Sequence, residues 1–224
     1  MMRLKRAIAA LHSSTSGVAA VEFALGLPLL LAVGLWGAEL GNLAVTHMRV
    51  SQLAMHIADN GSRIGDVSML ENLRIYESDI NDLLLGANVQ SGSIDLFEHG
   101  RVVISSLEVV PGTADTQYIH WQRCKGKRSF QSVYGPAGTG TDGSLVGMGA
   151  AGEEVTAGRD DAVIFVEVEY EYQPLISARF VSNRVITSTA AFNVRDDRDL
   201  SQIYQRDVAA PDNVAGCNVF NGFT

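Results

Sequence analysis

The sequence predicts an α+β fold with a long N-terminal helix, a second helix and an antiparallel sheet of four or five strands. Three observations support this class: an apolar run near the N-terminus, a seven-residue apolar repeat behind it, and strand-like patterns after Ala87. We expect a basic leader peptide over residues 1–17, a transmembrane and rod helix over 18–64, and an extracytoplasmic α+β head over 65–224.

The N-terminal apolar run is long enough to cross a membrane. Glu22 and Glu39 are the only charged side chains among the 28 residues from Val18 to Val45, and about 20 residues suffice for a transmembrane helix. The basic side chains before the run predict a cytoplasmic N-terminus and an exported head. A plain single-pass anchor is one alternative. A cleaved secretory signal is another, although the run is long for one and no A-x-A-like site follows it.

The apolar repeat predicts that the helix continues as a rod beyond the membrane. Leu43, Val50, Ile57 and Ile64 recur every seven residues and form one apolar stripe on an otherwise polar segment. Gly61 and Gly65 interrupt the pattern on either side of Ile64, so we expect the helix to end near Arg63.

A second helix is expected after a capping box. Ser68 and Glu71 have the spacing of a helix N-cap residue and the third helical residue, whose side chains satisfy each other's backbone N–H groups. Apolar side chains recur at helical spacing between Leu73 and Leu84, and Gly86 is expected to end the helix. We interpret this helix as part of the core of the head, with partner binding as the alternative.

The remaining regular elements are expected to be strands. Their predicted ranges are 101–110, 118–124, 129–134, 162–172 and 185–194. In the fourth range apolar side chains alternate with Glu167, Glu169 and Glu171, so one face of that strand is predicted to be apolar and the other acidic. We interpret the acidic face as solvated; attraction of a cation is the alternative.

A glycine-rich connection over 134–160 contains eight glycines in 27 residues, and its part 138–143 has the formal pattern G-x-G-x-x-G. A dinucleotide site needs a strand before this pattern and a helix after it. Pro136 precedes the pattern and no helical periodicity follows, so we expect a mobile surface loop and no cofactor.

Charge and cysteine content limit the partners and the compartment that the protein can have. The net charge is −8 although the leader is basic. An acidic head argues against nucleic acid as a partner, because phosphates are bound by clustered Lys and Arg. Cys124 and Cys217 are the only cysteines, and they suit one disulfide in an oxidising compartment. We expect this bridge to pin the polar tail from Asp212 to Thr224 to the sheet.

Enzyme motifs are missing from the sequence. The chain lacks H-E-x-x-H, C-x-x-C and G-x-S-x-G patterns, and its five histidines are dispersed. We interpret His47 and His56 as residues on the polar face of the rod helix and not as metal ligands. We therefore expect no catalytic residue, no metal and no cofactor; an exported enzyme on a membrane anchor is kept as an alternative.

The start of the apolar run combines a glycine, a glutamate and an aromatic residue. Gly17 ends the basic leader, Glu22 is the fifth residue after it, and Phe23 follows, within the string VAAVEFALGLPLLL. This segment resembles the processing site of type IV pilin-like proteins, and in particular the TadE-like minor pilins or pseudopilins of the tight-adherence (Tad/Flp) pilus. Major pilins usually have Tyr at the position of Phe23, so an aromatic ring is kept.

The resemblance implies a location, a processing step and partners. It implies a single-pass protein of the bacterial inner membrane that takes part in pilus assembly, with its N-terminus in the cytoplasm and its head in the periplasm. A prepilin peptidase would cut between Gly17 and Val18, and the partners would be this peptidase, other pilus-assembly subunits and membrane lipid. The main alternative is an uncleaved bitopic envelope protein whose exported head binds another component.

Glu22 is the residue on which this implied function depends most. A carboxylate in hydrocarbon costs about 2.5–3.5 kcal/mol at mid-membrane. Cleavage after Gly17 would create a free α-amine at Val18, which is mostly charged at neutral pH. A pair between Glu22 and the Val18 amine of a neighbouring subunit would offset the cost and set the register of the packed helices. The alternative is a solvated Glu22 at headgroup level.

Overall fold

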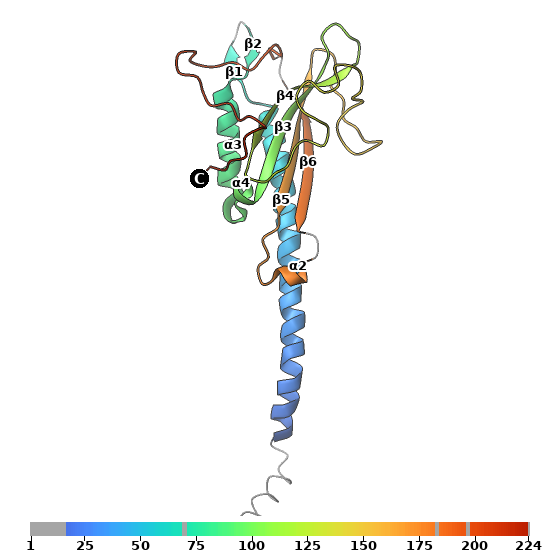
Figure 1. Cartoon of the computed structure of the whole chain (residues 1–224), viewed down its shortest axis with the longest axis vertical. Helices are drawn as coiled ribbons and strands as arrows, with labels where there is room; N and C mark the ends of the chain where they lie inside the picture. Colours follow the sequence, from blue (N-terminus) through green and yellow to red (C-terminus); the bar gives the residue numbers. More distant parts are fainter. Residues whose placement is uncertain (1–16, 69–70, 182–183, 196–197, 224) are drawn as a thin grey trace, which may run out of the picture. The chain divides into compact units, whose positions relative to one another are not determined.

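The computed structural model describes residues 17–68, 71–181, 184–195 and 198–223. Apart from Gly17, the expected leader lies outside this part of the chain. The regular elements are α2 (Val18–Gly61), β1 (Asp66–Ser68), β2 (Glu71–Arg74), α3 (Glu77–Ser91), η2 (Gly92–Ile94), α4 (Leu96–His99), β3 (Gly100–Val109), β4 (Gln117–Lys125), β5 (Ala162–Glu171), η3 (Ala178–Phe180) and β6 (Val185–Asn193) (Figure 1). They confirm the predicted α+β class.

Two compact units are distinguished by their internal contacts. The first, called the anchor unit, consists of Met1–Leu43 and Pro174–Ser182. The second, called the sheet unit, consists of Ala44–Gln173 and Asn183–Thr224. The anchor unit therefore combines the apolar part of α2 with a short piece of the connection between β5 and β6, and the sheet unit contains all the strands.

The sheet unit is organised around a four-stranded antiparallel sheet of order β4–β3–β5–β6. Ile104 on β3 lies opposite Arg123 on β4 and Val166 on β5, and Val166 lies opposite Ala190 on β6. β3 and β5 are buried at nearly every position, as expected for central strands that are covered on both faces. The four strands agree with the predicted ranges to within one residue at each end.

The fifth predicted strand, over 129–134, is wrong, because this segment is irregular. Phe130 is buried against Val103 and Cys124 instead of pairing with a strand. The backbone N–H of Val133 donates to Oε1 of Glu167 at 3.0 Å. This side-chain carboxylate takes the place of the backbone carbonyl that would accept the bond in a sheet.

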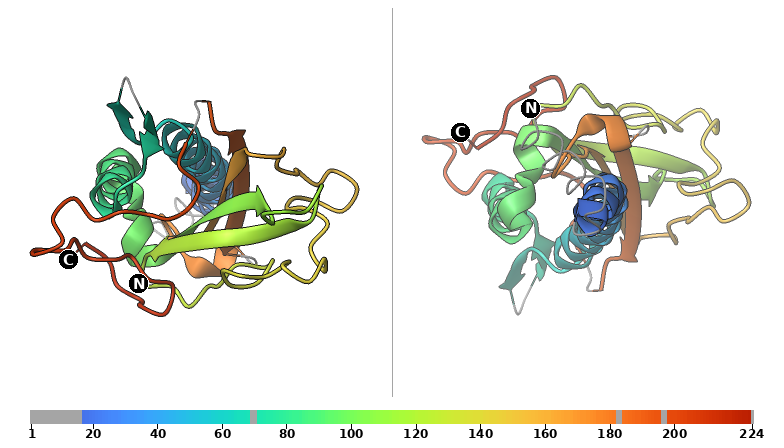
Figure 2. Two further views of the ribbon diagram at one scale, coloured as in Figure 1. Left: turned by 90° about the horizontal axis from the view of Figure 1, so that it is seen from above. Right: turned by 90° about the horizontal axis from the view of Figure 1, so that it is seen from below.

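The C-terminal part of α2 lies beside α3 on one side of the sheet (Figure 2). Val50 and Ile57, two members of the predicted apolar stripe, are fully buried here. Gly61 ends the helix where a Cβ atom would lie 3.1 Å from Cγ2 of Ile164 and 3.4 Å from Cδ2 of Leu83. The small residue therefore permits the close approach of α2, β5 and α3.

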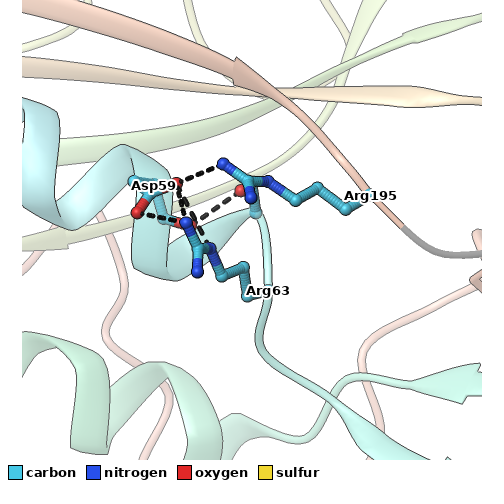
Figure 3. A network of polar contacts seen from close by, with 4 residues as sticks. Asp59, Arg63 and Arg195 are labelled. Atoms are coloured by element: carbon cyan, nitrogen blue, oxygen red, sulfur yellow. Dashed lines mark hydrogen bonds and ion pairs between the residues drawn. The ribbon is translucent and has the colours of Figure 1, made fainter.

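Ion pairs fix the end of α2 to the segment that follows β6. Asp59 accepts hydrogen bonds from Arg63 at 2.8 Å and from Arg195 at 2.9 Å (Figure 3). Both arginine side chains are half exposed, so each pair contributes at most about 1 kcal/mol to stability.

The second helix exists, but its predicted start and end are wrong. The strands β1 (Asp66–Ser68) and β2 (Glu71–Arg74) pair antiparallel here, with Asp66 opposite Arg74, and the middle of the expected capping box lies outside the described residues. α3 begins at Glu77, where Asp79 accepts a hydrogen bond from the N–H of Tyr76 at 3.0 Å. The helix also continues through Gly86, whose cost of about 1 kcal/mol is outweighed by packing of its apolar face.

The glycine-rich connection is irregular and mostly exposed, as expected for a surface loop, but a few of its residues pack on the sheet. Met148 is fully buried in a cluster with residues of β3, β4 and β5. The side chain of Gln117 donates to the carbonyl of Ala157 at 3.1 Å and accepts from its N–H at 2.7 Å. Gly140 has a φ of +96°, and a Cβ there would lie 2.3 Å from the carbonyl oxygen of Gln117. The glycine pattern thus serves close contact with β4.

The expected solvated acidic face of β5 is also wrong. Glu167 is almost fully buried, and this burial raises the pKa of its carboxyl group. Arg128 forms ion pairs with Glu169 at 2.5 Å and with Glu171 at 2.9 Å. The alternating carboxylates therefore bind the chain segment after β4, and only Glu171 keeps a largely exposed side chain.

The C-terminal tail is attached to the edge of the sheet at β4. Cys124 and Cys217 form the expected disulfide, with 2.03 Å between the sulfurs, and the N–H of Cys124 donates to the carbonyl of Ala215 at 2.8 Å. The fully buried guanidinium of Arg101 donates to the carbonyls of Cys217 at 2.8 Å and Val219 at 3.0 Å. The tail thus covers a sheet edge that would otherwise be open to pairing with another chain.

Candidate membrane anchor and assembly site

The apolar part of α2 has the properties of a membrane anchor. Among the described residues, α2 is the one helix that is long and apolar enough to cross a membrane, and none of its most apolar 18-residue stretch is buried within the protein. Phe23 is 65% and Leu25 is 75% exposed. A contiguous surface of this kind requires lipid or the apolar helices of other subunits as its cover.

The structure brings the four expected processing residues to one helix start. Gly17 immediately precedes α2, Val18 is its first residue, and Glu22 and Phe23 lie one turn later. Val18 and Glu22 are four residues apart and so share a helix face. The first turn contains no acidic side chain, so Glu22 is the first carboxylate that a new α-amine at Val18 would meet.

Glu22 differs from the other charged residues of the helix. Its side chain is exposed, and its carboxylate makes no hydrogen bond or ion pair with the part of the chain that the structure describes. Further along the same helix, a Cβ placed on Gly34, Gly37 or Gly41 would meet no atom within 4 Å. The helix surface at these glycines is therefore open to close approach by another helix.

Glu39, the second carboxylate of the apolar run, is fully satisfied within the anchor unit. It has no exposed surface, and its oxygens accept hydrogen bonds from the backbone N–H groups of Leu175 at 3.1 Å, Ile176 at 2.7 Å and Ser177 at 3.3 Å. Three converging N–H groups are a strong anion site in proteins. No local sequence pattern indicates this partner, because it lies about 136 residues further along the chain.

The sheet unit contains polar clusters that are internal to its fold. Glu77 pairs with Arg123, and Glu108 accepts from Ser106 Oγ at 2.6 Å and lies 3.0 Å from His120 Nδ1. The hydrogen bond to Glu108 raises the pKa of His120. Within the described ranges there is no group of three or more His, Cys, Asp or Glu side chains that would hold a metal ion.

Comparison with protein families decides the nature of the N-terminal segment. Residues 17–59 match the family model described as TadE-like protein. The resemblance expected from the residues around Gly17 and Glu22 is thereby confirmed over this TadE-like segment, which comprises Gly17 and nearly all of α2. No curated protein and no solved structure gives a significant match to the chain.

The TadE-like segment covers residues 17–59 of the chain. It comprises the exposed apolar helix, the helix start and both carboxylates described above, and it ends before the hairpin β1–β2. The match therefore includes both the exposed apolar part of α2 and the part of this helix that is buried in the sheet unit.

Proposed function

We propose that this protein is a minor pilin or pseudopilin that takes part in assembly of a tight-adherence pilus and is anchored in the inner membrane before assembly. The observation that carries the proposal is the combination, in one TadE-like segment, of an exposed apolar helix with a carboxylate that has no partner in the described chain. Lipid covers apolar side chains, but it does not compensate a buried charge.

In this proposal a prepilin peptidase cleaves between Gly17 and Val18, and the new α-amine of one subunit pairs with Glu22 of its neighbour. Val18 and Glu22 are separated by about 6 Å along the helix axis, since each residue adds 1.5 Å. A neighbouring helix displaced by about one turn therefore presents its amine to Glu22. Such a pair sets the axial register, while the apolar side chains of the helices exclude water.

The proposed topology places the N-terminus in the cytoplasm and the sheet unit in the periplasm. The disulfide between Cys124 and Cys217 supports this orientation, because such bridges persist in oxidising compartments. The sheet unit then has a structural or docking role and no catalytic one. Its polar clusters are consistent with this role, since they join elements of the fold to one another.

The processing step is tested with two glycine variants of the full-length protein. Gly17→Val is expected to abolish cleavage and leave a precursor heavier by the 17-residue leader, because an extended backbone with a branched side chain does not fit a narrow protease cleft. Gly26→Val is the matched control, since a Cβ at either glycine meets no atom within 4 Å.

The readout is the intact mass and the N-terminal residue of each protein, purified from cells with an active prepilin peptidase. The proposal predicts Val18 as the first residue of the wild type and the control. A wild-type protein that begins at Met1 in such cells would contradict the proposal and favour the uncleaved bitopic protein.

A further inference from the structure

The anchor unit contains a second apolar surface besides the helix. The segment Pro174–Ser182 belongs to this unit and includes η3. Three of its large apolar side chains are exposed: Leu175 at 66%, Ile176 at 38% and Phe180 at 37%. A short loop that exposes three such side chains together is unusual for a surface in water.

Glu39 holds this segment against α2. Its buried carboxylate accepts the N–H groups of three consecutive residues of the segment, Leu175, Ile176 and Ser177. Ser177 then caps the short helix η3, where its Oγ accepts from the N–H of Arg179 at 3.3 Å. The segment is thus attached to the apolar helix at one defined height.

The distance along the helix from Val18 to Glu39 corresponds to the thickness of a membrane. Glu39 follows Val18 by 21 residues in one continuous helix, which is about 32 Å at 1.5 Å per residue. The hydrocarbon core of a bilayer is about 30 Å thick. If α2 enters the membrane near Val18, it leaves near Glu39, and the attached segment lies at the far boundary between acyl chains and headgroups.

Two further side chains at this height suit a lipid boundary. Trp36, one turn before Glu39, is 51% exposed, and tryptophan is enriched at membrane–water interfaces. Arg179 is exposed beside the apolar side chains of the segment, where its guanidinium is able to reach lipid phosphates. An apolar surface that is continuous with a membrane span and is bordered by an aromatic ring and a cation matches an interfacial anchor.

We propose that the segment Pro174–Ser182 is a second membrane anchor, which inserts Leu175, Ile176 and Phe180 into the outer boundary of the bilayer while Glu39 fixes its depth. Glu39 is a positioning residue in this arrangement, because it touches the segment and not the lipid. The inference rests on the membrane span alone and is independent of pilus assembly and of cleavage.

The test measures the depth of residue 176 in a bilayer. The full-length protein is reconstituted in phosphatidylcholine vesicles that contain lipids with a nitroxide near the headgroup. Since both native cysteines are bridged, Ile176→Cys supplies a single free thiol for an environment-sensitive fluorophore. Val208→Cys is the matched control in the sheet unit, at a side chain that is 87% exposed.

Nitroxide lipids are expected to quench the label at residue 176 at least threefold more strongly than the label at residue 208. Equal quenching at the two positions would overturn the proposal. So would weak quenching at residue 176 together with disulfide cross-linking of the unlabelled Ile176→Cys protein to a second copy, because the apolar surface would then be a contact between subunits.

The role of Glu39 is tested by adding Glu39→Gln to each labelled variant. The amide keeps the size of the side chain but places N–H donors where the carboxylate accepted three bonds. Quenching at residue 176 is expected to fall by at least half, with no change at residue 208. Unchanged quenching at residue 176 would show that the segment inserts without Glu39 and would overturn its positioning role.

Discussion

The two carboxylates of the apolar helix have opposite surroundings, although both interrupt the same run of apolar side chains. Glu39 is fully buried and accepts three backbone hydrogen bonds from a distant loop. Glu22 is exposed and has no partner among the described residues. The comparison teaches that an acidic residue in an apolar helix serves one of two purposes. A satisfied one fixes the fold of its own chain, and an unsatisfied one indicates a partner outside it.

The same contrast separates the sheet unit from the TadE-like segment. Arg101, Glu77 and Glu167 are buried charged residues, and each has protein partners within the sheet unit. Changes to groups that have internal partners are therefore expected to reduce stability, whereas changes at Glu22 are expected to impair assembly and leave the fold intact.

The disulfide is expected to give the largest effect on stability. Replacement of both Cys124 and Cys217 by Ser removes a cross-link over 93 residues, which is worth about 4.6 kcal/mol in the chain-entropy model. The measurement is urea unfolding of the full-length protein in detergent micelles. A loss below about 1 kcal/mol would mean that the tail is held by its other contacts.

Arg101→Met is expected to destabilise the protein by roughly 3 kcal/mol, because one buried and two partly buried carbonyl acceptors lose their donor. Stacking of the guanidinium over the ring of Phe220, 4.0 Å from its centroid, is lost as well. Arg159→Met is the control at an exposed arginine and should change stability by less than about 0.5 kcal/mol. The same urea titration compares the two variants, and equal losses would contradict the assigned role of Arg101.

A smaller effect is expected from the pair of His120 and Glu108. The pKa of His120 is raised in the folded protein by its hydrogen bond to Glu108, so the protonated form favours folding. The stabilisation is complete below the unfolded pKa of about 6.5 and is lost as the pH rises through the higher folded pKa. The pair therefore makes the protein lose stability as the pH rises above about 6.5, and His120→Gln should remove this loss. His47→Gln, at an exposed position, is the control and should leave the loss unchanged. Identical pH profiles for both variants would contradict the pairing.

Sequence patterns predicted the elements that depend on local periodicity. The long helix and four strands follow from apolar runs and alternation, and their bounds agree closely with the structure. The start of α3 was missed because distant chain segments decide it. The N–H of Glu77 donates to the carbonyl of Tyr204, and that of Tyr204 to the carbonyl of Ile75. Such long-range bonds override a capping signal in four adjacent residues.

Partners of the carboxylates could not be predicted for the same reason. Arg128 lies about 41 residues from Glu169, and the N–H groups that bind Glu39 lie about 136 residues from it, so no local pattern connects them. Glu22 was easier to interpret, because its significance comes from neighbours in sequence, a glycine before it and an aromatic residue after it. Local motifs thus led to the proposed assembly site, whereas the fold of the sheet unit depended on contacts between distant residues.

The central claim is that Glu22 acts between subunits. Its most direct test is the number of pili on cells in which a gene that encodes the Glu22→Gln protein replaces the wild-type gene. The substitution removes the charge but keeps the shape of the side chain, so cleavage, membrane insertion and the urea stability of the protein should stay at wild-type values. Glu22→Asp, which keeps a carboxylate, is the matched control.

We expect the Glu22→Gln cells to contain normal amounts of mature protein beginning at Val18 and to carry at least tenfold fewer pili than the wild type. The Glu22→Asp cells should retain part of the piliation, because a shorter carboxylate still attracts the amine of a neighbouring subunit. Normal piliation with Glu22→Gln, at wild-type levels of mature protein, would contradict the account and would identify Glu22 as a carboxylate solvated at the membrane surface.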